Sequence, residues 1–161
     1  MYREILTKAV IAKGETTISE KEEINTTHNI SKVLGCWIIN HEYELSSQDN
    51  KVFINGHCDS FLWYGLNNNT DSDLIKKTFN YQKEIPYSFT LESFPLTNQN
   101  EIKSQIINEP YCVSMTFNNQ NINIEYKIKV AIEIIGETKI KIKVDDVIID
   151  DKIDTNYMKD S

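Results

Sequence analysis

The stretch INIEYKIKVAIEIIGETKIKIKV, residues 122–144, decides the fold class. Apolar residues occupy its even positions from 122 to 134 and again from 140 to 144, and charged residues fill most of the odd positions between them. An apolar residue at every second position is typical of a β-strand with one buried and one solvated face. The stretch therefore predicts an all-β fold of antiparallel strands.

The length of this stretch predicts a turn within it. As a single strand it would extend about 75 Å at about 3.3 Å per residue, which exceeds the expected width of a domain of 161 residues. A three-residue loop at 136–138 would pair Ile134 with Ile140, and would set Glu133 opposite Lys141 and Lys129 opposite Asp145. The alternative is a sharp bend at Gly136, with the two halves in different sheets.

A second hairpin is predicted around the polar cluster 118–121. A four-residue loop there pairs Phe117 with Ile122, Met115 with Ile124, Val113 with Tyr126 and Tyr111 with Ile128. Further strands are expected at 4–12, 33–43, 52–64, 74–81 and 102–107, the first of which would also suit a helix. Polar connections are expected at 14–32, 46–51, 67–73 and 95–100. The pattern predicts one β-sandwich or barrel-like domain, 1–144, followed by a tail, 145–161.

Charge is unevenly distributed along the chain. The net charge is −7, and residues 145–161 hold six Asp and two Lys, so this short acidic tail carries −4. The balance argues against a nucleic-acid binder, which needs a cationic face. The sequence contains neither an apolar run of membrane-spanning length nor a signal peptide, so we expect no membrane insertion. The acidic residues expected to contact partners are Asp145, Asp146, Asp150, Asp151 and Asp154.

Five lysines share one face of the deciding stretch and form a basic stripe: Lys127, Lys129, Lys139, Lys141 and Lys143. Such a stripe is either a solvated sheet face or a docking surface for acidic partners. Because the tail and the stripe carry opposite charges, the tail of one subunit could dock on the stripe of a neighbouring subunit.

The sequence predicts no catalytic, metal or cofactor site. The Gly35-Cys36-Trp37 segment is similar to the surroundings of a papain-type nucleophile, but the preceding cysteine and a distant downstream histidine are missing. A metal site from Cys36, His41, His57 and Cys58 is disfavoured because consecutive strand residues point to opposite faces. The three cysteines are expected to be reduced and buried. A cysteine hydrolase would instead require a fast-alkylating Cys36.

Large apolar residues occupy both faces of the segment 52–64. Phe53, Phe61 and Trp63 alternate with a second apolar set, and a half-exposed strand would not need them. The segment is therefore either covered on both sides or part of a subunit interface built on these three residues. A different class of function is a carbohydrate-binding sandwich that uses Trp37, Trp63 or Tyr64 as a sugar platform.

Several blocks, in order along the chain, are specific enough to indicate a family. They are YREILTKAVIAKG at 2–14, LGCWIINHEY at 34–43, VFING at 52–56 with Trp63-Tyr64 after it, and VAIEIIGETK at 130–139. Together they resemble the CotE family of outer spore-coat morphogenetic proteins of endospore-forming bacteria. The chain departs from that pattern at Cys36, where the family's Gly-Gly-Trp motif has glycine, and in its short tail of Asp rather than long Glu runs.

The resemblance implies a non-enzymatic scaffold without a cofactor. Such a protein is made in the mother-cell cytoplasm, is deposited on the forespore surface as part of the spore coat, and self-associates into a homo-oligomer. It recruits outer-coat proteins, depends on the basement-layer ATPase of the coat for its localisation, and uses an acidic C-terminal tail for partner contacts.

Overall fold

The computed structural model describes residues 2–90 and 100–143, and these form seven β-strands. The strands are β1 (Tyr2–Asn25), β2 (Ile30–Gln48), β3 (Lys51–Leu66), β4 (Asp71–Ile85), β5 (Ser88–Phe89), β6 (Glu101–Asn118) and β7 (Asn121–Lys143). The described residues contain no helix, and hence none that could span a membrane. The prediction of an all-β fold is confirmed.

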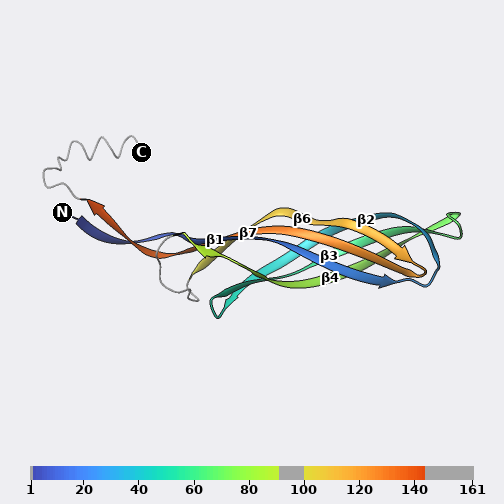
Figure 1. Cartoon of the computed structure of the whole chain (residues 1–161), viewed down its shortest axis with the longest axis horizontal. Helices are drawn as coiled ribbons and strands as arrows, with labels where there is room; N and C mark the ends of the chain where they lie inside the picture. Colours follow the sequence, from blue (N-terminus) through green and yellow to red (C-terminus); the bar gives the residue numbers. More distant parts are fainter. Residues whose placement is uncertain (1, 91–99, 144–161) are drawn as a thin grey trace, which may run out of the picture.

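The strands form two antiparallel sheets, one of four strands in the order β5-β1-β7-β6 and one of three in the order β2-β3-β4 (Figure 1). β2 packs against β6 and β4 packs against β1 at the two sides. The central strands β7 and β3 therefore supply the middle of the core. Every even residue of β7 from Ile122 to Ile134 is buried, as the alternation predicts.

β7 is one uninterrupted strand of 23 residues, so the predicted turn at Gly136 is wrong. Its partner β1 has 24 residues and pairs with it from Tyr2 opposite Lys143 to Asn25 opposite Asn121. Glu133 therefore lies opposite Lys13 and Lys103 rather than Lys141. The molecule is elongated along these two strands (Figure 1), and a width based on a compact domain does not limit their length.

Gly136 is required by close packing rather than by a turn. A Cβ atom at this position would lie 2.7 Å from Cδ1 of Ile11 and 2.6 Å from Nδ2 of Asn100. Gly136 marks the point where the four-stranded sheet narrows, because the pairing of β6 with β7 begins at Glu101 opposite Ile135. Beyond it, β7 pairs only with β1 among the described strands.

The β6–β7 hairpin is confirmed near its turn and wrong further along. Phe117 pairs with Ile122 and Met115 with Ile124 as predicted, although the loop is shorter because Asn118 pairs with Asn121. A register shift between Cys112 and Ser114 then sets Cys112 opposite Tyr126 and Tyr111 opposite Lys127. Val113 and Tyr111 therefore do not pair with Tyr126 and Ile128.

The expected polar connection at 14–32 is also wrong over most of its length, because β1 continues to Asn25. A bulge between Val10 and Ala12 changes which face of the strand is buried. The other expected strands are present and longer than predicted, and the connections within 46–51 and 67–73 contain short turns. Residues 95–99 lie outside the described part of the chain.

Candidate assembly surfaces

Exposed aromatic side chains gather on the outer face of the three-stranded sheet. Trp37 of β2 lies opposite Phe61 of β3, and Leu74 of β4 lies opposite Trp63 of β3. The rings of Trp37 and Trp63 are stacked with centroids 6.3 Å apart and planes inclined by 25°. Trp37 is 52% exposed and Trp63 is 40% exposed. We call Trp37, Phe61, Trp63 and Leu74 the aromatic patch.

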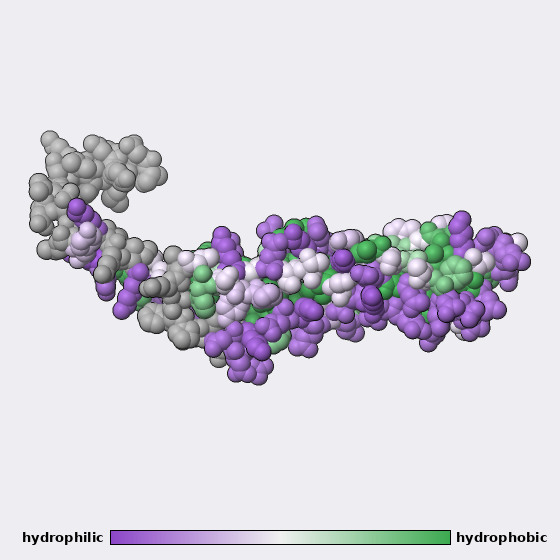
Figure 2. Space-filling view, in the orientation of Figure 1, coloured by the Kyte–Doolittle hydropathy of each residue, from purple (hydrophilic) through white to green (hydrophobic). Residues whose placement is uncertain are grey.

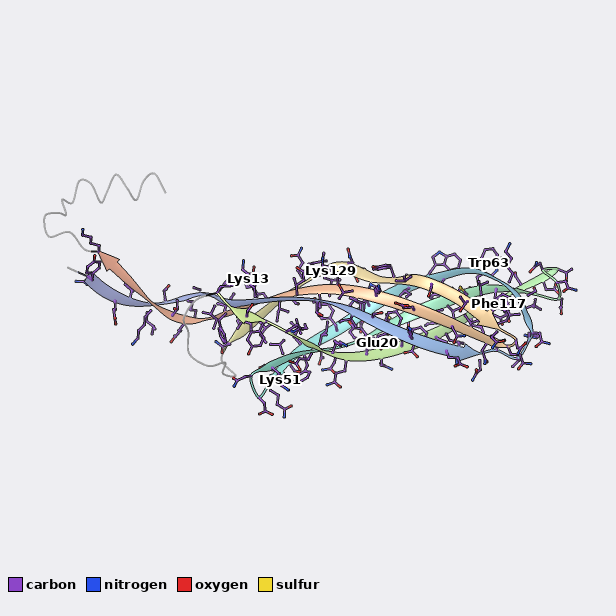
Figure 3. All side chains as sticks on the ribbon, in the orientation of Figure 1. Lys13, Glu20, Lys51, Trp63, Phe117 and Lys129 are labelled. Carbon is purple, nitrogen blue, oxygen red and sulfur yellow. The ribbon has the colours of Figure 1, made fainter. Side chains whose placement is uncertain are left out.

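Local backbone features position this patch. A Cβ atom at Gly35 would lie 3.1 Å from Cη2 of Trp37, so the absence of a side chain there lets the indole lie along its own strand. Trp63 points outward because its neighbours Leu62 and Tyr64 fill the core. Figure 2 shows apolar surface emerging from an otherwise hydrophilic surface toward the end of the molecule where Trp63 lies in Figure 3.

A charged and hydrogen-bonded rim borders the patch. The Thr78 hydroxyl donates to Asp59 at 2.7 Å and the Asn40 amide donates at 3.0 Å, and both contacts hold the pKa of Asp59 below its usual value. Lys76, which lies opposite Phe61, has its Nζ 3.7 Å from Oδ2 of Asp59. An apolar centre with a polar rim is the usual anatomy of a protein–protein interface.

The structure does not bring all three predicted interface residues together. Phe61 and Trp63 belong to the aromatic patch, whereas Phe53 lies eight positions earlier on β3, opposite Ser46 and Glu84. At about 3.3 Å per residue this is about 26 Å away. Phe53 shares the outer face of the sheet with the patch but does not extend it.

A small polar hollow adjoins Trp63. It has a volume of about 320 Å³ and is lined by Lys32, Leu34, Trp63, Gly65, Asn69, Thr70, Asp71 and Ser72. Asn69 Oδ1 accepts a hydrogen bond from the Ser31 hydroxyl at 2.8 Å, which fixes the β3–β4 turn against β2. The hollow places amide, hydroxyl and carboxylate groups beside an indole ring.

His41 forms a buried polar group that the sequence reasoning missed. A bulge between Ile39 and Glu42, with Asn40 at a φ of 55°, turns the imidazole inward. Its Nδ1 lies 3.2 Å from Oε2 of Glu109, and its Nε2 bonds the Tyr81 hydroxyl. Because a carboxylate only accepts, Nδ1–H donates to Glu109, and Nε2 shares a hydrogen bond with the Tyr81 hydroxyl.

The His41 group has a structural role. Both imidazole nitrogens are occupied by protein partners, and the contacts join β2, β4 and β6 across the two sheets. Gly56 makes this possible, since a Cβ atom there would collide with the Tyr81 ring.

The three cysteines are free, and Cys58 alone is fully buried. The Cys112 thiol donates to the Ser114 carbonyl at 3.3 Å, and its interaction with the Cys36 thiol on β2 lowers the pKa of Cys112 and raises that of Cys36. Burial raises the pKa of Cys58 to about 11. A raised pKa at Cys36 is the opposite of what a nucleophile at that position needs.

His57 and Cys58 lie on opposite sides of β3, as expected. His57 is partly exposed, with Nε2 3.3 Å from Oε2 of Glu42, while Cys58 is in the core. Over residues 2–90 and 100–143, three or more potential metal ligands do not gather at any one point.

The basic stripe is divided into two groups. Lys127 and Lys129 lie over the sandwich, where Lys129 Nζ is 2.9 Å from Oε1 of Glu15 (Figure 3). The other three lie beyond Gly136, with Lys139 opposite Leu6, Lys141 opposite Glu4 and Lys143 opposite Tyr2. Ten positions separate Lys129 from Lys139, which is about 33 Å along a strand. The tail residues from Asp145 onward lie outside the described part of the chain.

Strand β6 carries further exposed apolar residues that the sequence reasoning did not identify: Ile107, Tyr111, Val113 and Phe117. They do not share one face, because Tyr111 lies opposite Lys127 and Phe117 lies opposite the buried Ile122. β6 is an edge strand, and three register shifts interrupt its pairing with β7. Bulges of this kind protect sheet edges against further pairing. Only the high apolar content of 106–117 could have signalled these residues.

These features define a class: an elongated two-sheet β-protein that presents aromatic and apolar side chains on a sheet face and along strand edges. Comparison with family models identifies the family. The model described as Outer spore coat protein E (CotE) matches residues 1–161, and the chain belongs to this family. Comparison with curated proteins and with solved structures gave no match.

Membership confirms the resemblance and establishes the setting. The protein is located in the spore coat and has a morphogenetic role there. The family consists of structural coat proteins that are not known as enzymes, and it points to interactions with other coat proteins.

Proposed function

We propose that this protein is a scaffold of the spore coat that self-associates through its aromatic patch and recruits outer-coat proteins. The observation that carries the proposal is the stacked pair of Trp37 and Trp63, exposed on the outer face of the three-stranded sheet. Aromatic residues are enriched at protein interfaces, where they supply large apolar contact area.

The position of the patch favours a contact between copies over a loop-covered core. Leu62 and Tyr64, the neighbours of Trp63, already fill the interior, so the tryptophan is not needed there. Repetition of a modest contact in a layer gives strong overall binding through avidity. A flat patch on a sheet face suits such repetition.

The test is to replace Phe61 and Trp63 with Ser and to measure the mass of the particles by sedimentation velocity. We expect smaller particles with an unchanged β-type circular dichroism spectrum. Phe117→Ser is a matched control, because Phe117 is 40% exposed like Trp63 but lies on β6. Unchanged particle mass contradicts the proposal. If the double variant unfolds, Leu74→Ser supplies the same test at a more exposed position.

We further propose that the acidic tail contacts basic surfaces, including the lysines of a neighbouring subunit. Lys139 and Lys143 are exposed beyond the sandwich, whereas Lys129 is already paired with Glu15. Deleting residues 145–161 should weaken self-assembly and the recruitment of coat proteins, including the basement-layer ATPase. The assembly and recruitment that remain should depend less on salt concentration. Replacing Asp145, Asp146, Asp150, Asp151 and Asp154 by Asn in the full chain is the matched control, because it removes the charge and keeps the length of the tail. An unchanged assembly with the same salt response contradicts this proposal.

Carbohydrate binding is a second candidate, favoured by the polar hollow beside Trp63. Sugar rings stack on exposed indoles and need amide and hydroxyl partners of the kind found there. Titration of tryptophan fluorescence with spore cortex or coat glycans distinguishes the two functions. A saturable change lost in Trp63→Ser supports sugar binding, and a flat titration supports the scaffold alone.

A further inference from the structure

The first part of β1 and the last part of β7 form a two-stranded arm. β1 pairs with β7 from Tyr2 opposite Lys143 to Ala9 opposite Gly136, whereas β5 pairs only with Ala12 and Lys13. Among the described strands, none pairs with the outer edge of β1 between Tyr2 and Val10. Figure 1 shows this arm extending beyond the other strands at the end opposite the β6–β7 turn.

The arm lacks two of the usual protections of an exposed strand edge, a proline and a bulge. An isolated two-stranded ribbon is only marginally stable in water, and an open flat edge readily pairs with another strand. The arm exposes large apolar side chains, with Tyr2 at 69% and Leu6 at 55%. Among the β1 residues on this open edge there is no proline, and the only bulge in the pairing with β7 comes after Val10.

We propose that the open edge of β1 pairs antiparallel with the same edge of a second copy of this chain, centred on Leu6. The two arms then form one continuous four-stranded sheet in the order β7-β1-β1-β7. The inference rests on the proposed function in that both concern self-association, but it uses a surface separate from the aromatic patch.

Complementarity along the open edge sets the register. The segment after β5 closes this edge from Val10 onward, because the Thr90 hydroxyl donates to the Val10 carbonyl at 3.1 Å and the Thr90 amide donates to the Ile11 carbonyl at 2.8 Å. A symmetric antiparallel pair centred on Leu6 joins residues 3–9 of the two copies and stays clear of that segment.

This register is chemically self-complementary. Leu6 lies opposite Leu6 of the second copy, and Glu4 lies opposite Lys8. Symmetry makes the Glu4–Lys8 pair occur twice. Directly opposed residues share a face of the sheet, so apolar pairs and opposite charges both favour the contact.

Two other ways of extending the arm are disfavoured. Pairing through the free edge of β7 is disfavoured because exposed lysines such as Lys139 and Lys143 protect a strand edge against further pairing. If the arms stacked by translation, adjacent copies would lie only about 10 Å apart, and the four-stranded sheets behind them would collide. In the antiparallel arrangement the two sandwiches lie at opposite ends of the joined arms.

The proposed contact also explains how a layer could grow. Trp63 lies near the end of the molecule opposite the arm (Figure 3). A symmetric contact through the arm alone makes a closed dimer, whereas two different contacts at opposite ends make an extended assembly.

The test uses charge reversal and mixing in the full chain. Glu4→Lys and Lys8→Glu, each alone, turn two ion pairs between copies into two like-charge pairs, so each should raise the dissociation constant of the arm contact roughly 30-fold. An equimolar mixture restores opposite charges at both pairs and should return the constant to near the wild-type value. The pairs within the arm, Glu4 with Lys141 and Lys8 with Glu137, are unchanged by mixing. Lys77→Glu on β4 controls for net charge.

A cross-linking experiment tests the register without reversing the charge of either residue. In a Cys36→Ser/Cys112→Ser background, Leu6→Cys should form disulfide-linked dimers under oxidised glutathione. Lys8→Cys alone should not form such dimers. It should form a disulfide with Glu4→Cys when the two variants are mixed. Thermal unfolding curves establish that each variant is folded.

The outcomes separate the two proposals. Recovery on mixing, with cross-linking at Leu6→Cys, supports the arm contact. The arm contact is overturned if the single charge variants associate like the wild type. It is also overturned if Lys8→Cys cross-links to itself as readily as Leu6→Cys. In either case the scaffold function stands if the aromatic-patch variants still dissociate. A wild-type chain that is monomeric at every concentration overturns both.

Discussion

Replacing Gly136 by Ala tests the long, unbroken β7 directly. In the structure, the new Cβ would lie 2.7 Å from Cδ1 of Ile11 and 2.6 Å from Nδ2 of Asn100, both closer than non-bonded carbon atoms normally approach. If Gly136 were instead in a hairpin turn, Ile11 would not sense the change. The variant therefore distinguishes a strand from a turn at the base of the arm.

The expected magnitude comes from two opposing terms. Overpacking of a buried site costs about 1–3 kcal/mol, and replacing Gly by Ala within a strand returns about 0.5–1 kcal/mol of conformational free energy. Gly136→Ala should therefore lower the free energy of unfolding by roughly 0–2.5 kcal/mol. Ile11→Val, which removes the colliding methyl group, should alone cost about 0.5–1.5 kcal/mol.

The double variant gives the decisive number. Because the Ala methyl would occupy space vacated by Cδ1 of Ile11, the two changes together should cost about 1 kcal/mol less than their sum. Urea denaturation measures this coupling, at protein concentrations low enough that the midpoint no longer depends on concentration. Additive effects of the two substitutions would refute the packing assigned to this position.

Three further predictions concern the interior. Tyr126→Phe should raise the free energy of unfolding by about 1 kcal/mol, because its buried hydroxyl has no partner among the described residues; Tyr81→Phe, which loses a bonded hydroxyl, should lower it by a similar amount in the same melt. Gly56→Ala should cost about 1–3 kcal/mol by collision with the Tyr81 ring, and a neutral result would contradict that contact. Alkylation of Cys112 should accelerate as pH rises through about 7, since the interaction with Cys36 lowers its pKa; in Cys36→Ala the acceleration should move to higher pH, and an unmoved profile would exclude the thiol contact.

The alternation of residues 122–134 was sufficient to predict the fold class and the central core strand, because a strict period of two has one structural interpretation. The long β1 was not predictable in the same way. Its bulge between Val10 and Ala12 changes the buried face, and only Ile18 and Ile24 mark the core positions after Gly14. Because the sequence pattern does not reveal β1 as a partner of matching length, it predicts a turn rather than a single strand of 23 residues.

The aromatic patch was partly predictable. Alternation along β3 places Phe53, Phe61 and Trp63 on the outer face of the sheet. Phe53 is separated from the other two only by its distance along the strand. The stacking of Trp37 on Trp63 depends on the register of β2 with β3, which three irregularities shift. Such shifts are set by tertiary packing and leave no periodic signal in one strand.

We propose that this coat protein builds an assembly from contacts between its own copies. Sedimentation velocity combined with light scattering, on the purified full chain over a wide concentration range, measures this self-association. We expect a mass that rises with concentration beyond that of a dimer, because the arm and the aromatic patch provide two different contacts. A monodisperse monomer at the highest concentration would show that the protein does not self-associate.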